Sequence, residues 1–383
     1  MTARDRHAPM SGAQLEATVE PLDYPWDSAP ETGRTFEIAP GVRWLRMPMP
    51  GGLNHINLYL LRGDDGWTIV DTGLGDDTTQ AAWEQIFADE LDGAPVTRIL
   101  VTHMHPDHVG QAGWLSERWR APLYMTRAEY YQARAFSASG PSGSSWEAEA
   151  FYRAAGLTER ELAAMRERMS GGGGYGAMIT PMPMSYRRLR EGDTFTLAGH
   201  DWRVVIGSGH SPEHACLYCR ALGIMISGDQ VLPVITSNVS VHPNEPEANP
   251  LKDWLDSHDA LLALPDETLV LPAHNMPFRG LRKRLRALTA HHEDRMLALE
   301  EYCEKPATAR ELLPILFRRE LDDRQMMMAL GEGIAHLHLL MHRDRIERLA
   351  GEDGVWRFRS IDPDLARRRR ADHDAPDDGP MLV

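Results

Sequence analysis

The most constraining feature of the chain is a dense run of potential metal ligands at positions 101–110, which reads Val-Thr-His-Met-His-Pro-Asp-His-Val-Gly. It continues an apolar stretch that predicts a buried strand. Alternate side chains of an extended segment share a face, so His103 and His105 can reach one ion. Asp107 and His108 follow where the chain turns into a helix and can address a second ion. Burying these polar groups unpaired would be costly, so the run indicates a metal site.

More candidate ligands occur farther along the chain in the same local setting. His210, Asp229 and His274 each follow a short apolar run, with a small residue directly before the ligand. An α/β scaffold places the residues that follow its strands at one edge of its sheets, where rigid elements support them. We therefore expect these three side chains to converge with the histidine run.

The pattern of short apolar runs and amphipathic stretches predicts a layered α/β body. Predicted strands lie at 42–47, 57–62, 67–70, 98–102, 194–197, 202–206, 215–218, 224–227 and 268–270, and predicted helices at about 77–91 and 109–119. Asp76, Asp77 and Thr78 are the candidate caps of the first helix, because each side chain can accept a bond from a free backbone N–H.

The stretch at about 135–190 interrupts this pattern and predicts an insertion. It contains a helical segment, Trp146–Met169, between a Ser/Gly-rich run and the glycines at 171–174. Glycine hinges around an amphipathic helix favour a lid over a pocket, with a long surface excursion as the alternative.

The last hundred residues change character. Helical patterns at 281–296, 309–317, 325–330 and 333–343, followed by a strand at 354–359, give the outline of a winged helix. We predict an N-terminal arm at 1–35, a catalytic domain at 36–280 with the insertion, a mostly helical winged-helix-like domain at 281–360 and a flexible tail at 361–383. The arm is polar and rich in proline, and it either lies on the body or is disordered.

With these motifs in place, the chain resembles the metallo-β-lactamase-fold hydrolase superfamily over about residues 35–280. The resemblance rests on Asp71 after an early strand, on the His-x-His-x-Asp-His run, and on His210, Asp229 and His274. It implies an α/β fold, namely the αββα sandwich of that superfamily, here with a helical lid and a C-terminal winged-helix-like segment. A bridging aspartate without a bridging cysteine resembles the glyoxalase II, lactonase and nuclease branches more than true β-lactamases.

The resemblance also implies a ligand set. One ion would be held by His103, His105 and His210 and the other by Asp107, His108 and His274, with Asp229 between them. His214 would lie outside this set, and Glu213 stands where a glycine is commoner, a departure that can alter the loop. Asp71 would either hold a ligand histidine in one tautomer or cap a turn.

Two divalent ions roughly 3.5–4 Å apart can share a water and lower its pKa towards ~7, which supplies a bridging hydroxide at neutral pH. Asp107 and Asp229 are the predicted catalytic carboxylates, and Asp107 would orient the hydroxide. Histidine-rich ligation favours Zn²⁺, and mixed histidine and carboxylate sites also accept iron or manganese. We thus expect a metal-dependent hydrolase.

We favour a thioester or ester substrate, such as an acyl-CoA or glutathione thioester or a lactone. The basic run with Arg279, Arg282 and Lys283 could bind an anionic carrier, although a solvated helix face would look the same. Asn57 lies on an edge that in the resembled fold faces the site, with ordinary turn chemistry as the alternative. The partner would be a small acyl molecule.

Two other functions stay open, a metal-dependent nuclease or phosphodiesterase and a regulatory or binding protein. The formal net charge of −15 disfavours a broad nucleic-acid surface. No apolar run approaches the ~20 residues needed to cross a bilayer, so we expect no membrane association. The low number of cysteines fits a reducing, cytoplasmic setting, which we also expect. Homo-oligomer formation stays open. Three cysteines are too few for a disulfide framework, and Cys216 and Cys219 are predicted to be core residues. His291 and His292, adjacent on a helix, are predicted to be structural or interface residues.

Overall fold

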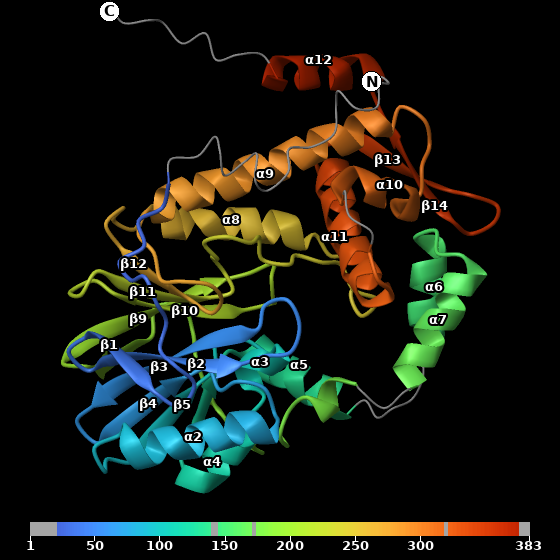
Figure 1. Cartoon of the computed structure of the whole chain (residues 1–383). Helices are drawn as coiled ribbons and strands as arrows, with labels where there is room; N and C mark the ends of the chain where they lie inside the picture. Colours follow the sequence, from blue (N-terminus) through green and yellow to red (C-terminus); the bar gives the residue numbers. More distant parts are fainter. Residues whose placement is uncertain (1–20, 139–144, 171–173, 318–320, 375–383) are drawn as a thin grey trace, which may run out of the picture.

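Two stacked β-sheets form the centre of the computed structural model, which describes residues 21–138, 145–170, 174–317 and 321–374 (Figure 1). The first sheet follows the order β1-β2-β3-β4-β5-β6-β7 and the second the order β12-β11-β10-β9-β8. The first sheet consists of β1 (Thr35–Ala39), β2 (Val42–Pro48), β3 (His55–Gly63), β4 (Gly66–Val70), β5 (Val96–Leu100), β6 (Leu123–Met125) and β7 (Arg187–Arg188). The second consists of β8 (Thr194–Leu197), β9 (His200–Gly207), β10 (His214–Cys219), β11 (Ile224–Gly228) and β12 (Leu269–Pro272).

Helices cover the outer face of each sheet and complete four layers. Those associated with the first sheet are α2 (Asp77–Asp89), α3 (Pro106–Val109), α4 (Ala112–Trp119) and α5 (Arg127–Ala138). The second sheet carries α8 (Pro250–Leu262) and α9 (Leu281–Tyr302) (Figure 1). Trp44 and Trp202 pack in the core between the sheets, whereas Trp83 and Trp254 pack in the two cores beneath the helices. The predicted αββα sandwich is confirmed.

Strand β10 shows why its apolar run carries two cysteines. Every residue of β10 is buried, because the strand has a packed layer on each face. Cys216 packs in the core on the helix side, and Cys219 packs in the core between the sheets. Both thiols are free and buried, so the prediction that they are core residues is confirmed.

Most of the sequence-predicted elements of the sandwich are present with small shifts of their ends. Asp76 is the N-cap of α2, and its side chain accepts a 2.7 Å hydrogen bond from the Thr79 backbone N–H. The short strands β1, β6 and β7 and the helices α5 and α8 were not predicted. The run 109–119 contains a break, because α3 ends at Val109 and α4 begins at Ala112.

The insertion contains two helices rather than the single one predicted over 146–169. These are α6 (Trp146–Ala154) and α7 (Glu159–Ser170), and a 3₁₀ turn, η2 (Tyr175–Ala177), follows. Gly156 separates them with a φ of +99°, a conformation that glycine adopts readily. Phe151 and Leu162 pack in the same core as Leu312 and Leu313 of the C-terminal region, so the insertion is anchored on that region.

The C-terminal region contains α10 (Ala309–Leu316), α11 (Asp323–His342) and the antiparallel pair β13 (Ile346–Ala350) and β14 (Trp356–Ser360). The expectation of separate helices at 325–330 and 333–343 is wrong, because α11 runs through both. Gly331 is required by a close approach, since a Cβ there would lie 2.9 Å from the Ser240 side chain and from the Val241 carbonyl.

A flexible tail from 361 is also wrong for the residues described there. Helix α12 (Pro363–Asp374) packs along α9 (Figure 1). The buried Arg370 Nη1 lies 2.8 Å from Asp294 Oδ1 and anchors this helix. The tail's last residues, 375–383, lie outside the described residues, as do 1–20 of the predicted arm and the glycines at 171–173. Residues 21–34 lie on the body, where Arg279 N–H bonds the Asp23 carbonyl. Within the described ranges, no helix has the length and apolar character needed to cross a bilayer.

Candidate metal centre

The candidate ligands gather where several strands end at one edge of the sandwich. Strands β4 and β5 are parallel neighbours in the first sheet, and β11 and β12 are parallel neighbours in the second. Their carboxyl ends therefore lie at a common edge, as the sequence predicts. The chain leaving β5 carries the histidine run, Asp229 directly follows β11, and His274 follows β12 after one intervening residue.

The histidine run is extended first and helical afterwards. Pro106 begins α3, so Asp107 and His108 lie in its first turn, where Pro is favourable because its missing N–H is not needed. Before the helix, His103 and His105 point to the same side, and His103 Nε2 lies 2.8 Å from His105 Nδ1. His103 Nε2 also lies 3.2 Å from Nε2 of His210, a residue that follows β9 of the second sheet.

Two groups of potential ligand atoms result, each with its atoms within 4.8 Å of one another. The first contains His103, His105, His210 and Asp229, and the second contains Asp107, His108 and His274. Within the second group, His274 Nε2 lies 3.4 Å from Asp107 Oδ2 and His108 Nε2 lies 3.7 Å from it.

Asp229 contacts both groups. Its Oδ2 lies 3.4 Å from His210 Nε2 and 3.5 Å from His108 Nε2, and its Oδ1 lies 3.5 Å from His274 Nε2. Ligand atoms bound at ~2.1 Å around a tetrahedral ion are roughly 3.4 Å apart, which these separations match.

Orphaned polar atoms give a second test of the fit to metal ions. His108 Nε2 and Asp229 Oδ1 are buried and have no hydrogen-bond partner among the described residues. Buried polar groups are ordinarily satisfied, so such atoms call for an additional partner. Imidazole nitrogens and carboxylate oxygens aimed at one space are the donor set that divalent transition metals bind. The residues present therefore fit two divalent ions.

The far ring nitrogen of several candidate ligands is held by a fixed acceptor. His108 Nδ1 lies 2.8 Å from Asp71 Oδ2, His210 Nδ1 lies 2.8 Å from the Asn238 carbonyl, and His274 Nδ1 lies 3.0 Å from the His55 carbonyl. Donation from Nδ1 to these oxygens leaves each Nε2 with a free lone pair. Asp71 also accepts from the Thr102 backbone N–H at 2.7 Å, so it joins the two strand ends and orients His108.

The charges of the site separate its histidines into two kinds. Burial and the neighbouring imidazoles lower the pKa of His103 well below its usual value and that of His105 to about 3. Burial would also lower the pKa of His274, but Asp229 and Asp107 outweigh it and raise this pKa to about 10. The histidines in turn outweigh burial and keep the pKa of Asp229 well below its usual value. The carboxylates are therefore ionised, and a bound cation would displace a proton from His274.

Sequence reasoning missed Glu129, a buried carboxylate that joins two ligand-bearing loops. Its Oε2 accepts a 2.9 Å bond from the Met104 backbone N–H, between His103 and His105. Its Oε1 accepts a 2.8 Å bond from the Glu213 N–H, three residues after His210. Glu129 is distinguished from the other polar residues of its helix segment only by its burial, and burial is not visible in the sequence.

Two residues of the second histidine loop support the site without joining either group. The Glu213 carboxylate accepts a 2.9 Å bond from the Ala128 N–H at the start of α5, so this departure from glycine ties the loop to a helix. His214 Nε2 accepts a 3.1 Å bond from the Asp229 N–H and holds that carboxylate's backbone.

The predicted substrate-binding residues are not at this centre. Asn57 is buried and bonds the carbonyls of Pro272 and Asn275 at 2.9 and 2.8 Å, so it supports the loop that carries His274 rather than facing a substrate. The guanidinium groups of Arg279 and Arg282 bond the carbonyls of Glu267 and Leu262, and neither residue is in the described lining of the cavity beside the centre. Lys283, on the same turn of α9, is also absent from the described lining of the cavity beside the centre.

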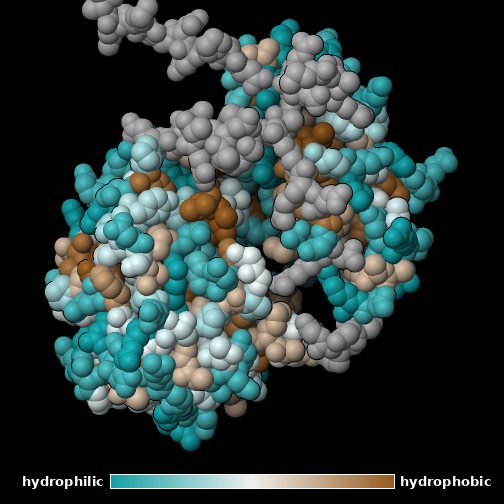
Figure 2. Space-filling model, in the orientation of Figure 1, coloured by the Kyte–Doolittle hydropathy of each residue, from teal (hydrophilic) through white to brown (hydrophobic). Residues whose placement is uncertain are grey.

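A cavity of about 440 Å³ lies beside the first ligand group. Figure 2 shows a hollow between the sandwich and the unit formed by α6, α7 and α11. Its lining includes Met104 and His105 from the ligand loop, Phe136 from α5, Tyr152 from α6, Met165 from α7 and Met327 from α11. The anchored insertion therefore forms one wall of this cavity, which agrees with the expectation that it covers a pocket.

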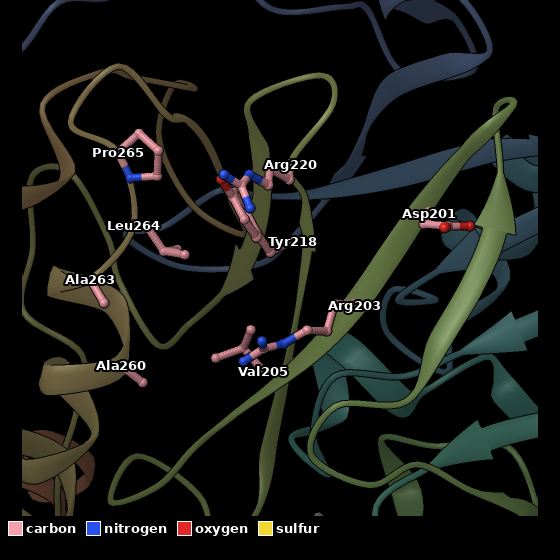
Figure 3. A pocket seen from close by; sticks show the side chains of 9 residues that line it. All are labelled: Asp201, Arg203, Val205, Tyr218, Arg220, Ala260, Ala263, Leu264 and Pro265. Carbon is pink, nitrogen blue, oxygen red and sulfur yellow. The ribbon is translucent and has the colours of Figure 1, made fainter.

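A second hollow, of about 520 Å³, lies at the other end of β9 and β10. Figure 3 shows Arg220 beside Tyr218 on one side and Leu264 and Pro265, which follow α8, on the other. Tyr218 pairs with Arg203 at that end of the ladder, whereas His214 pairs with Gly207 at the metal end. The second hollow is therefore separate from the metal centre.

Comparisons with known proteins agree with this geometry. A family model described as "Metallo-beta-lactamase superfamily" matches residues 51–274, and one described as "Metallo-beta-lactamase-like, C-terminal domain" matches residues 296–361. The chain is 46% identical to a β-lactamase domain protein from Burkholderia ambifaria, covering 91% of this chain and 99% of that one with a TM-score of 0.83.

Two further proteins are similar at lower identity. A metallo-beta-lactamase family protein from Thermus thermophilus is 32% identical, with a TM-score of 0.69 and coverage of 85% of this chain and 100% of that one. The acyl-coenzyme A thioesterase MBLAC2 of Gallus gallus is 28% identical over 244 residues, which are 62% of this chain and 78% of that protein.

Proposed function

The chain belongs to the metallo-β-lactamase superfamily of metal-dependent hydrolases, and from this premise we propose that it hydrolyses thioesters or esters of small acyl groups at a dinuclear metal centre. One ion would be held by His103, His105 and His210, the other by Asp107, His108 and His274, with Asp229 between them. When bound, two such ions polarise a carbonyl oxygen and make hydroxide available at neutral pH. Zn²⁺ suits this donor set best, and iron or manganese are the alternatives.

The chain's own carboxylates would orient the attacking water. The pKa of Asp107 is lowered because His108 and His274 outweigh the effect of burial, so the group is ionised at neutral pH. An ionised Asp107 can accept a hydrogen bond from the attacking water and later receive its proton. The distance of 3.4 Å between Asp107 Oδ2 and His274 Nε2 supports this role for the carboxylate.

The observation that carries the substrate class is the cavity beside His105. Apolar and aromatic side chains, three methionines among them, make up most of its described lining, and its volume of about 440 Å³ is in the range of small-molecule sites. An apolar wall next to a hydrolytic centre suits an acyl chain whose carbonyl lies at the metals. Similarity to an acyl-coenzyme A thioesterase supports the same class.

A substrate panel tests the proposal. Protein reloaded with Zn²⁺, Fe²⁺ or Mn²⁺ is assayed for thiol release from acyl-CoA and acyl-glutathione thioesters and for opening of acyl lactones. We expect metal-dependent hydrolysis of at least one thioester or lactone, and its loss in Asp229→Asn.

The same preparations are assayed on single-stranded RNA and on an aryl phosphodiester. Phosphodiester cleavage without hydrolysis of any thioester or lactone would overturn the proposal in favour of a nuclease. A metal-loaded protein that is inactive on both panels would also contradict it and would favour a regulatory or binding role.

A further inference from the structure

The cavity beside His105 carries one full positive charge on an otherwise mostly apolar lining. Arg168 of α7 is the only lysine or arginine among the described residues that line it, and none of these residues is a carboxylate. Gln132 and Asn244 add neutral polar groups. The charge of Arg168 therefore has no carboxylate beside it among the described residues of the cavity wall.

The neighbouring arginine on the same helix shows the contrast. Arg166 Nε lies 3.4 Å from Glu149 Oε1, and Arg166 Nη2 lies 3.7 Å from Glu159 Oε2. Arg168 has no ion pair or hydrogen bond with any residue in the described part of the chain, and its charge instead acts on the phenol of Tyr152 in the cavity wall. Arg166 thus pairs with carboxylates within the insertion, whereas Arg168 is available to a ligand in the cavity.

The two ends of a ligand can be assigned from the lining. Met104 and His105 belong to the metal centre, so the reacting carbonyl would lie at that end. Arg168 lies on the wall contributed by the insertion, together with Tyr152 of α6 and Met165 of α7. Arginine binds carboxylate and phosphate oxygens with paired hydrogen bonds. A ligand that contacts both the metal centre and Arg168 would therefore have an apolar chain with an anionic group at a distance from the carbonyl.

We propose that this cavity is the substrate-binding site and that Arg168 determines specificity by binding an oxyanion group of the substrate. The inference rests on the proposed hydrolysis of acyl compounds and names the substrate class within it. The oxyanion has two sources, a terminal carboxylate on the acyl chain or a phosphate of the carrier.

Four thioesters separate these sources. Octanoyl and 7-carboxyheptanoyl groups are each presented on coenzyme A and on N-acetylcysteamine, which has no phosphate. The value of kcat/KM is measured for the wild type, for Arg168→Gln, for the charge-conserving Arg168→Lys and for Arg166→Gln as the matched control on the same helix. Thermal melting verifies that each variant is folded.

If the anion is an acyl carboxylate, Arg168→Gln lowers kcat/KM about 10- to 100-fold for both carboxyheptanoyl substrates, and octanoyl substrates change less than about twofold. If the anion is the carrier's phosphate, the loss follows coenzyme A whatever the acyl group. In either case Arg168→Lys recovers part of the loss and Arg166→Gln has no effect. Equal behaviour of Arg168→Gln and Arg166→Gln on all four substrates would overturn the inference.

A binding measurement keeps the inference distinct from the proposed function. Suberate, octanoate and coenzyme A are titrated calorimetrically into the wild type and Arg168→Gln. Hydrolysis of none of the four thioesters by the wild type would count against the proposed function. The inference would still stand if suberate or coenzyme A binds at least about tenfold more weakly to Arg168→Gln, and it fails if neither binds differently.

Discussion

The molecule contains two buried groups of histidines, and only one of them has the arrangement of a metal site. One is the metal centre at the sheet edge. The other, the helical histidine cluster, consists of His258 on α8, His291 and His292 on α9, and His336 on α11. In this cluster His292 Nδ1 lies 2.9 Å from His336 Nε2, and the ring centroids of His258 and Trp254 are 4.2 Å apart. The number of buried histidines therefore does not identify a metal site.

Carboxylates make the difference between the two groups. At the sheet edge, Asp107 and Asp229 lie among the imidazoles, and the pKa of His274 is raised to about 10. In the helical histidine cluster, burial lowers the pKa of His258 to about 4 and that of His336 to about 3. These histidines are neutral packing groups at physiological pH. The only close groups of potential ligands among the described residues lie at the sheet edge.

The largest expected effect comes from removing the carboxylate that contacts both ligand groups. Asp229→Asn should lower kcat at least about 10³-fold, since the loss of metal-assisted stabilisation is worth several kcal/mol. His291→Gln, a buried histidine of the other group, is the control and should stay within about twofold of wild type. Steady-state kinetics of the metal-loaded proteins measures both. Similar losses in the two variants would abolish the distinction between the groups.

A smaller effect is expected from Asp71, which holds the far nitrogen of His108. Asp71→Asn should weaken metal affinity about 10- to 100-fold, as is typical of residues that orient ligands. Competition with a chromophoric chelator measures this affinity. Asp76→Asn, which alters only the N-cap of α2, should leave it unchanged; an unaltered affinity in Asp71→Asn would show that the tautomer of His108 does not need this support.

Glu129 gives a test of the loops beneath the first ligand group. Glu129→Gln keeps the size of the side chain but places an amide N–H₂ against one of two backbone donors, Met104 or Glu213. We expect metal affinity to fall about tenfold, with Glu129→Asp restoring part of it. Native metal content after dialysis against a chelator series measures the change. Unchanged metal content, together with an unchanged melting temperature, would contradict a positioning role.

The smallest effect concerns pH and the helical histidine cluster. The pKa of His258 is lowered by burial to about 4, so the unfolded chain binds its proton first as the pH falls. The stabilisation from neutral His258 is complete above about pH 6.5 and declines toward pH 4, by about 1 kcal/mol between pH 7.5 and 5.5. Urea unfolding at both pH values should show this decline in the wild type and less of it in His258→Leu. An equal decline of the free energy of unfolding in the two proteins would mean that His258 is solvated in the folded state.

The metal centre could be predicted from the sequence because its ligands lie next to strand ends. Each of His210, Asp229 and His274 follows a strand closely, so a correct order of strands is enough to bring them together. Glu129 and Arg168 could not be found in this way, because each lies inside a helix. Whether such a side chain faces solvent, a loop or a cavity depends on the partner packed against the helix.

The features that the sequence does not reveal have the same origin. Arg279 and Arg282 look like a basic patch in the sequence, yet their guanidinium groups satisfy carbonyls of a loop and of α8. The sequence predicts two helices on either side of Gly331, but the helix is continuous and the glycine is needed where the segment around Ser240 approaches α11 closely. The charged stretch at 363–374 looks unstructured until Arg370 meets Asp294, 76 residues away. Long-range partners decide each case.

Counting bound metal ions tests the central claim most directly. The wild type, Asp229→Asn, His108→Ala and the control His291→Gln are freed of metal with a chelator and reloaded with Zn²⁺. Native mass spectrometry then measures the mass of each protein with its bound ions. The geometry of the two ligand groups requires two ions per chain in the wild type and in His291→Gln, and fewer in the other two variants. A wild type with no bound ion, or a count that is unchanged in His108→Ala and Asp229→Asn, would contradict the account.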